Sequence, residues 1–142
     1  MDKLEENLFY TLEKAIKTYR QFAQKRISEA GVDITIDQWL ILKTIQNNPE
    51  YSQHQLAETV FKDFASVTRM VELLVKKAYL TRSAHPLDRR RFLLKITDLG
   101  MATLDKVYPI VAENRKMALA NFSSSDIETL KQQLNDLITN CQ

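Results

Sequence analysis

The chain has 142 residues, 44% hydrophobic and 27% charged, which is enough for one domain with an apolar core. Only 2 Gly and 3 Pro argue against sandwiches, barrels and glycine-rich phosphate loops, and favour a mainly helical fold. The net charge of +2 predicts no partner by itself, and the single Cys excludes an intramolecular disulfide. With no secretory signal and no apolar run near the ~20 residues that span a bilayer, the chain is expected in the cytoplasm and not in a membrane.

The first part of the chain is predicted to form one long amphipathic helix. Apolar residues recur every three or four positions from Leu4 to Ile27, and Gly31 is the expected helix stop. Two capping-box patterns then predict two further helix starts, because a side-chain oxygen and a glutamine three positions later satisfy free backbone N–H groups. The patterns are Thr35–Gln38, whose helix is ended by Asn47–Pro49, and Ser52–Gln55, whose short helix runs from Gln53 to Val60.

The middle of the chain changes from helix to strand. Asp63 can cap a fourth helix that reaches about Ala78. Residues 79–82 and 91–96 are strand-like, and the turn-forming residues 85–88 lie between them, so the two runs are predicted to pair as a hairpin. A helix followed by such a hairpin is typical of a winged helix-turn-helix.

Two more helices complete the prediction. Thr97 caps one that extends to about Ala120, and Pro109 is expected to kink or break it near Tyr108. Ser123 caps the last helix. The predicted fold is therefore mainly α, an α+β winged helix-turn-helix in the order α-α-α-α-β-β-α-α.

The terminal helices carry more apolar surface than the central block can cover, so we expect a homodimer that buries it. The expected parts are an N-terminal dimerisation helix over residues 1–34, a DNA-binding domain over residues 35–97, and C-terminal dimerisation helices over residues 98–142.

Positive charge is concentrated in the centre of the chain. Residues 62–95 hold nine basic and three acidic side chains, a net charge of +6, whereas the segments before and after each carry −2. A basic patch on a nearly neutral protein suits phosphate binding, although a solvated charged face is the plainer interpretation.

The helix from Asp63 to Ala78 is the candidate for reading DNA. At 100° per residue its apolar positions gather on one side, and small or basic residues gather on the other. Arg69 can bond guanine O6 and N7 with two donors, and small residues let the backbone approach base edges. The predicted major-groove set is Ala65, Ser66, Thr68 and Arg69, and the predicted phosphate contacts are Lys62, Lys76 and Arg82.

The tip of the hairpin carries three adjacent arginines. Such a cluster gains little from core packing, whereas a narrow minor groove attracts arginine. Asp88 is expected to orient the tip by pairing with one of the arginine side chains. The predicted minor-groove set is Asp88, Arg89, Arg90 and Arg91.

These motifs together resemble the MarR family (multiple antibiotic resistance regulators) of bacterial transcription factors, over nearly the whole chain. Asp88–Arg90 with Ile96–Gly100 is similar to the family's wing and following helix. Val67–Arg69 with Leu74–Arg82 looks like its recognition helix and first wing strand. Gln55–Ala57 and Thr35 with Gln38–Trp39 resemble earlier helix motifs of the family.

The resemblance implies a homodimer with interlocked terminal helices, recognition helices in successive major grooves of an inverted repeat, and wings in the minor grooves. It also implies release of DNA by a small aromatic or lipophilic effector, for which Tyr10, Tyr19, Trp39 and Tyr108 are candidate pocket residues. Plain core packing is the alternative for these aromatics.

Two residues depart from the family pattern. His85 stands where an acidic residue usually precedes the proline, which places the usual hydrogen bonding of the wing in doubt. Ala78 replaces the usual glycine after the recognition helix, so that helix is expected to end differently, because Ala tolerates positive φ poorly.

Other classes of function have little support. His54, His85 and Cys141 show no metal-ligand spacing, and an Asp88–His85 pairing is explained equally well by a loop contact, so no metal, cofactor or enzymatic activity is predicted. Cys141 does not match the family's redox positions. The main alternative is a winged-helix adaptor that binds an acidic protein instead of a specific DNA sequence.

Overall fold

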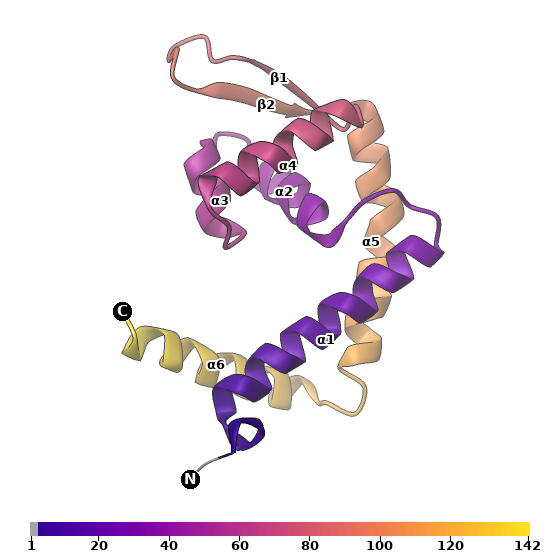
Figure 1. The fold of residues 1–142 in the computed structure, drawn as a ribbon. Coiled ribbons are helices and arrows are strands. Elements are labelled where there is room, and N and C mark those ends of the chain that lie inside the picture. The colour runs from indigo at the N-terminus through magenta and orange to yellow at the C-terminus, as the bar shows by residue number, and fades with distance from the viewer. Residues whose placement is uncertain (1–2) are drawn as a thin grey trace.

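The computed structural model describes residues 3–142 (Figure 1). These residues form a short 3-10 helix, six α-helices and a two-stranded antiparallel sheet. The elements are η1 (Leu4–Glu6), α1 (Leu8–Glu29), α2 (Ile36–Asn47), α3 (Gln53–Thr59), α4 (Phe64–Lys76), β1 (Leu80–Ala84), β2 (Phe92–Ile96), α5 (Asp98–Ala118) and α6 (Ser124–Asn140). The mainly helical class and the predicted order of elements are confirmed.

The molecule has two levels (Figure 1). The elements α2 to β2 form a head, from which β1 and β2 project as the wing, while α1 and α6 lie below it and α5 runs between the two levels. The core lies mainly in the head, where α4 buries Val67, Val71 and Leu74 completely against α2 and α3. Burial of each such side chain contributes about 1.5–3 kcal/mol, so this packing holds α4 in place.

Local capping chemistry sets most of the helix starts. Thr35 and Ser52 form the capping boxes that the sequence predicts, at the starts of α2 and α3. Ser123, the predicted cap of α6, forms a capping box with Asp126. The first helix begins later than predicted, at Leu8 rather than Leu4, because Asn7 Oδ1 accepts a hydrogen bond from the Phe9 N–H at 2.8 Å and caps it there.

The predicted break at Pro109 is wrong. Helix α5 runs without interruption from Asp98 to Ala118 and includes Pro109. It buries Leu104 and Val107 before the proline and Val111 after it. This packing on both sides of Pro109 offsets the backbone hydrogen bond that a proline inside a helix removes.

The expectation that Ala78 changes the end of α4 is also wrong. Ala78 adopts the left-handed conformation, with φ of 63°, that glycine usually supplies at this position. Its N–H donates to Val75 O at 3.0 Å, and the Tyr79 N–H donates to Leu74 O at 2.9 Å, which is the Schellman ending. The alanine keeps the glycine geometry and carries the strain.

A tight joint connects the end of α4 to α5. Thr97 Oγ1 accepts the Gly100 N–H at 3.0 Å and donates to Ala78 O. A Cβ on Gly100 would lie 2.3 Å from Tyr79 O, so only glycine fits where α5 passes the start of the wing. This contact explains the Ile96–Gly100 motif in physical terms.

The lower level leaves apolar surface open. Helix α6 has no buried residue, and Ile16 of α1 is 54% exposed. An apolar groove of about 590 Å³ runs between α1, α5 and α6, lined in part by Ile16, Leu130 and Leu134. Among residues 3–142, no helix is both long and apolar enough to cross a membrane.

The strain at Ala78 leads to a stability prediction. Ala78→Gly should raise the free energy of unfolding by about 1 kcal/mol, because glycine adopts positive φ without a Cβ clash. Gly31, with φ of 77° and open space around it, is the matched control, and Gly31→Ala should lower the free energy by a similar amount. Chemical denaturation of both variants measures this, and an unchanged or lower stability of Ala78→Gly would contradict it.

Candidate nucleic-acid interface

Helix α4 presents the predicted polar side to solvent. Its buried positions lie on one side, and Ala65, Arg69 and Lys76 are exposed on the other. Figure 1 shows α4 on the outside of the head, between α3 and the wing. An exposed helix beside a wing is the arrangement that places a recognition helix in a major groove.

A short hydrogen-bonded chain orders the first two turns of α4. Asp63 caps the helix by accepting the Ser66 N–H at 2.7 Å, and it also accepts the Ser66 hydroxyl at 3.1 Å. Arg69 Nη2 in turn donates to Ser66 Oγ at 3.2 Å. The backbone hydrogen bond from Ser66 is the main cause that lowers the pKa of Asp63, and the charge of Arg69 lowers it further. Arg69 is thus hydrogen-bonded to Ser66 on an exposed surface of α4.

Thr68 is less available than predicted. Its side chain is half-buried, and its hydroxyl donates to Phe64 O at 3.0 Å and accepts from Gln53 of α3. Within this structure Thr68 therefore links α3 to α4.

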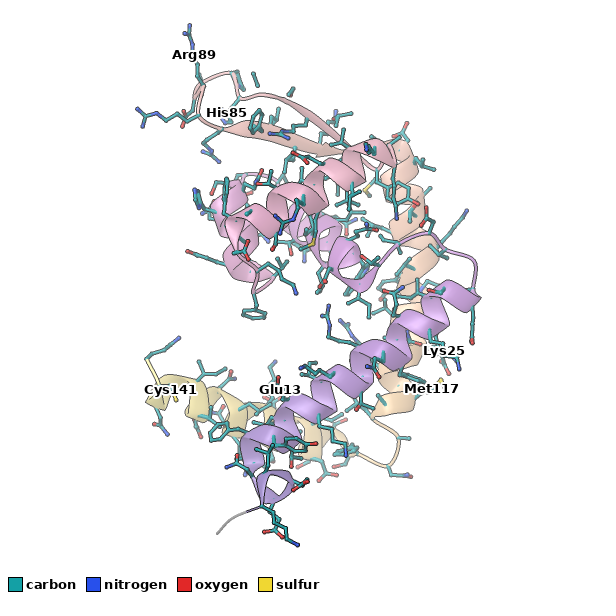
Figure 2. The ribbon with its side chains drawn as sticks, viewed as in Figure 1. Glu13, Lys25, His85, Arg89, Met117 and Cys141 are labelled. Atoms are coloured by element: carbon teal, nitrogen blue, oxygen red, sulfur yellow. The ribbon has the colours of Figure 1, made fainter. Side chains whose placement is uncertain are left out.

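The wing tip differs from the prediction in how Asp88 acts. Its carboxylate accepts the backbone N–H of Arg90 at 2.9 Å, and it forms no ion pair with any arginine in the part of the chain that the structure describes. Arg89 and Arg90 are exposed, and Figure 2 shows Arg89 projecting beyond the tip. Asp88 orders the turn through the backbone and leaves both guanidinium groups open to a partner.

His85 supplies the acceptor that the wing turn needs. Its Nδ1 accepts the Leu87 N–H at 3.1 Å, as the oxygen of an acidic side chain would do. The imidazole therefore replaces the usual carboxylate without loss of this hydrogen bond, and the wing loses one negative charge.

Arg91 occupies a different environment from its two neighbours. It is half-buried, and its Nη2 donates to the backbone oxygen of Glu50, in the loop between α2 and α3, at 3.0 Å. The structure therefore does not group Arg91 with the two exposed arginines at the tip.

The predicted phosphate contacts also divide. Lys76 is exposed in the last turn of α4. Lys62 instead forms an ion pair with Asp37 of α2, with 3.8 Å between Lys62 Nζ and Asp37 Oδ2. The Arg82 guanidinium stacks 3.8 Å above the Phe92 ring, within the wing. Lys76 is the basic group of the three with the most freedom to meet a phosphate.

The four aromatic residues predicted for an effector pocket do not line one common pocket in this structure. Trp39 and Tyr108 line a small pocket of about 90 Å³ between α2 and α5. Tyr19 lines the groove between α1, α5 and α6, and Tyr10 lines a separate hollow on α1. The charged residues that line the α2–α5 pocket are Lys43 and Asp105. Arg115 lines the groove between α1, α5 and α6, and its guanidinium lies 5.7 Å from the centroid of the Trp39 ring.

One exposed pair near α4 was not predicted. The rings of His54 and Phe64 stack with their centroids 4.3 Å apart, at the start of α4. An aromatic residue directly after the Asp63 helix cap is the sequence signal that would identify it. Within residues 3–142, no three His, Cys, Asp or Glu side chains gather as a metal site.

The fold and these surfaces define a winged helix-turn-helix DNA-binding protein. The MarR family model matches residues 34–92. A Thauera aromatica protein named as a transcriptional regulator of the hcr operon is 31% identical over 122 residues, which cover 86% of this chain and 72% of that protein. The chain belongs to the MarR family of transcriptional regulators, which are not enzymes.

Solved structures agree on the fold. Bordetella bronchiseptica BpsR, studied for regulation of its DNA binding by 6-hydroxynicotinic acid, is 19% identical with a TM-score of 0.86 over 96% of both chains. A cysteine-to-serine variant of E. coli MarR in complex with operator DNA is 23% identical with a TM-score of 0.84 over 92% of both chains.

The cap of α4 leads to a pH prediction. Because folding lowers the pKa of Asp63 below its ordinary value of 3.8, ionised Asp63 stabilises the fold above that value, and this contribution is lost as pH falls through the lower folded-state pKa. Asn caps equally well but does not titrate, so Asp63→Asn should lose less stability than the wild type between about pH 5 and pH 2.

Denaturant unfolding across this pH range tests the prediction. Asp126 of α6, whose pKa is also lowered by a backbone hydrogen bond, from Ser123, is the matched control. Asp126→Asn should likewise reduce the loss of folding stability as the pH falls from about 5 to 2, and it should leave the affinity for DNA unchanged. Identical acid profiles for wild type and Asp63→Asn would contradict the assigned role of Asp63.

Proposed function

We propose that this protein is a homodimeric, sequence-specific DNA-binding repressor that a small molecule releases from its operator. The observation that carries the proposal is the ordered Asp63–Ser66–Arg69 chain on exposed α4, beside a wing with two open arginines. A guanidinium held in place before binding loses less entropy when it bonds a guanine.

Each element has a proposed role. Arg69 reads a guanine, and Ala65 lets α4 approach the base edges of the major groove. Arg89 and Arg90 enter the minor groove, where the potential is most negative. Lys76 binds a phosphate and thereby fixes the register of α4 on the duplex.

The lower level supports a dimer. Leu130 is 44% and Ile138 is 50% exposed on α6, a helix that buries none of its residues within its own chain. A second copy that interlocks through α1 and α6 would cover this surface. We propose residues 1–34 and 98–142 as the dimerisation parts and residues 35–97 as the DNA-binding domain, which acts in the cytoplasm.

Selection of bound oligonucleotides from a random pool tests this function. A dimer should select an inverted repeat with half-sites about one turn, ~34 Å, apart. Arg69→Ala should lose its preference at one base pair of each half-site, a discrimination of about 1–3 kcal/mol. Lys25→Ala, on α1 and far from the wing in Figure 2, is the control that should keep it. Weak binding without any preferred sequence would instead favour the protein adaptor.

We further propose that the effector is an aromatic carboxylate bound between α2 and α5. Trp39 and Tyr108 supply ring surfaces, and Arg115 supplies a cation near the Trp39 ring. The pocket of about 90 Å³ is smaller than the ~150 Å³ cavity that holds a benzene ring, so a ligand must separate α2 from α5. Such a movement would turn the head relative to the dimerisation helices. The chemical class of the effector is supported by BpsR, whose DNA binding is regulated by 6-hydroxynicotinic acid, an aromatic carboxylic acid.

Trp39 is the only tryptophan, so its fluorescence reports on this pocket directly. Titration with hydroxynicotinate and benzoate derivatives should quench the fluorescence and release DNA over the same concentration range. Arg115→Met should weaken both effects about tenfold or more, through loss of a charge-assisted contact of about 1.5–3 kcal/mol. Tyr10→Phe, in the separate hollow on α1, should change neither the quenching of Trp39 fluorescence nor the release of DNA. Release of DNA without any change at Trp39 would place the effector elsewhere.

A further inference from the structure

We infer that Arg91 is a positioning residue that fixes the wing against the head and so aims Arg89 and Arg90. This inference rests on the proposed DNA-binding function, but it assigns Arg91 a role other than entry into the minor groove. Its basis is the contact between the Arg91 side chain and a loop 41 residues earlier in the chain.

The backbone of Arg91 closes the wing turn. Its N–H donates to Asp88 O at 3.1 Å, and its carbonyl accepts the His85 N–H at 3.2 Å. Arg91 therefore lies where the wing loop joins β2. Because its backbone closes the turn that carries Arg89 and Arg90, a contact made by its side chain also fixes that turn.

The side chain of Arg91 extends from the wing to the head. Its Nη2 donates to Glu50 O at 3.0 Å, and its Nε is inaccessible to solvent and has no hydrogen-bond partner among the described residues. Ser52, two residues after Glu50, caps α3. Arg91 therefore ties the far end of the wing to the start of the helix-turn-helix.

The wing needs such a tie. It pairs only five residues of β1 with five of β2, and an isolated two-stranded hairpin is marginally stable in water. At its base the wing is held by the contact of Thr97 with Ala78. With the Arg91 contact added, both ends of the hairpin are fixed, so the angle of the tip to α4 is set before DNA binds.

The alternative role, a third minor-groove cation, conflicts with this geometry. To reach DNA, Arg91 would have to give up its hydrogen bond to Glu50 O. Arg89 and Arg90 are exposed already and need no such change. The two roles differ in a measurable quantity, because a cation that meets the DNA backbone contributes to the salt dependence of binding and a positioning residue does not.

The test measures affinity for the selected operator against salt concentration. Arg91→Met should weaken binding roughly five- to tenfold with an unchanged salt slope, since its cost is the entropy of ordering a loose wing. Arg90→Ala should flatten the slope by about one unit. In the double variant Arg90→Ala should flatten the slope by the same amount as in the wild type, because the wing makes the same contacts once it is ordered on the DNA. Arg91→Lys, which keeps a donor, should recover part of the affinity.

Amide hydrogen exchange in the absence of DNA provides a second readout. The amides of residues 87–91 should exchange faster in Arg91→Met than in wild type, with unchanged protection in α2 and α5 as the control for folding. A slope lowered by about one unit in Arg91→Met would overturn the inference. Unchanged exchange would overturn it even if DNA binding is confirmed, whereas a wild type without a preferred site would reject the proposed function itself.

Discussion

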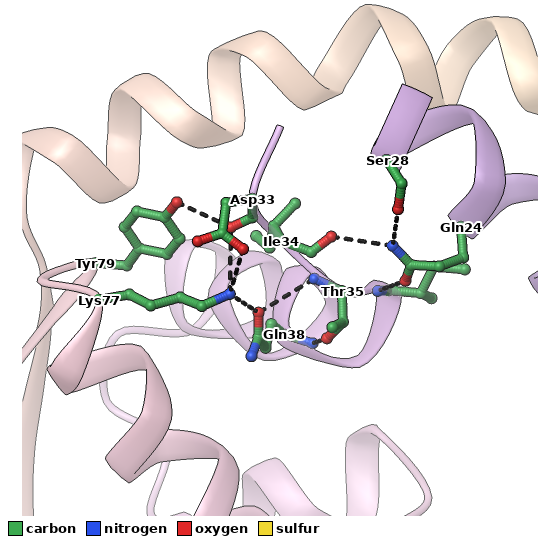
Figure 3. A network of polar contacts seen from close by, with 9 residues as sticks. Gln24, Ser28, Asp33, Ile34, Thr35, Gln38, Lys77 and Tyr79 are labelled. Carbon is green, nitrogen blue, oxygen red and sulfur yellow. Dashed lines mark hydrogen bonds and ion pairs between the residues drawn. The ribbon is translucent and has the colours of Figure 1, made fainter. Parts of the chain in front are cut away.

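The orientation of α4 is the constraint on which the proposed DNA-binding surface depends, and the short segment 33–38 holds it at both ends. At the far end, Lys77 Nζ donates to Asp33 Oδ1 at 3.0 Å and to Gln38 Oε1 at 2.9 Å (Figure 3). At the near end, Lys62 pairs with Asp37 of the same segment. Each partly exposed ion pair contributes little energy by itself, about 0–1 kcal/mol. Their value lies in geometry, because two separated contacts prevent rotation of α4 on its apolar face.

Two residues with strained backbone conformations, one before and one after α4, also help to fix the position of this helix. Phe61, which is 92% exposed with φ of 60°, precedes the helix, and Ala78 follows it with φ of 63°. Each is the left-handed residue of a Schellman ending. At Phe61, the Phe61 N–H donates to Glu58 O and the Lys62 N–H donates to Ala57 O. A strain of about 1 kcal/mol at each position is small beside the burial of the apolar face of α4. The packing therefore decides the backbone, and the two turns around α4 are fixed despite their unfavourable residues.

Whether a sequence prediction was correct depends on how far apart in the chain the interacting residues lie. Capping boxes at Thr35 and Ser52 were predicted correctly because a cap involves residues within one turn. The uninterrupted path of α5 through Pro109 depends on side chains buried against other elements, which no local pattern contains. The contact of Arg91 with Glu50 crosses 41 residues, so adjacency to Arg89 and Arg90 suggested a shared role that the fold does not provide. The general position of the basic surface was predictable, whereas the task of each cation on it was not.

The two elements proposed to bind DNA, α4 and the wing, have separate anchors, and this separation has a consequence for the proposed regulation. Segment 33–38 comprises the end of the loop after α1 and the first turn of α2. Because Arg20 of α1 donates to Asp37 in this segment, α1 is connected through the segment to both ends of α4. The wing is anchored instead on the joint with α5 and on the loop between α2 and α3. A displacement of α1 relative to α2 therefore acts first on α4, while a displacement of α5 relative to α2 acts first on the base of the wing. Since specific binding requires α4 and the wing to engage one duplex together, a change in either anchor is sufficient to weaken it.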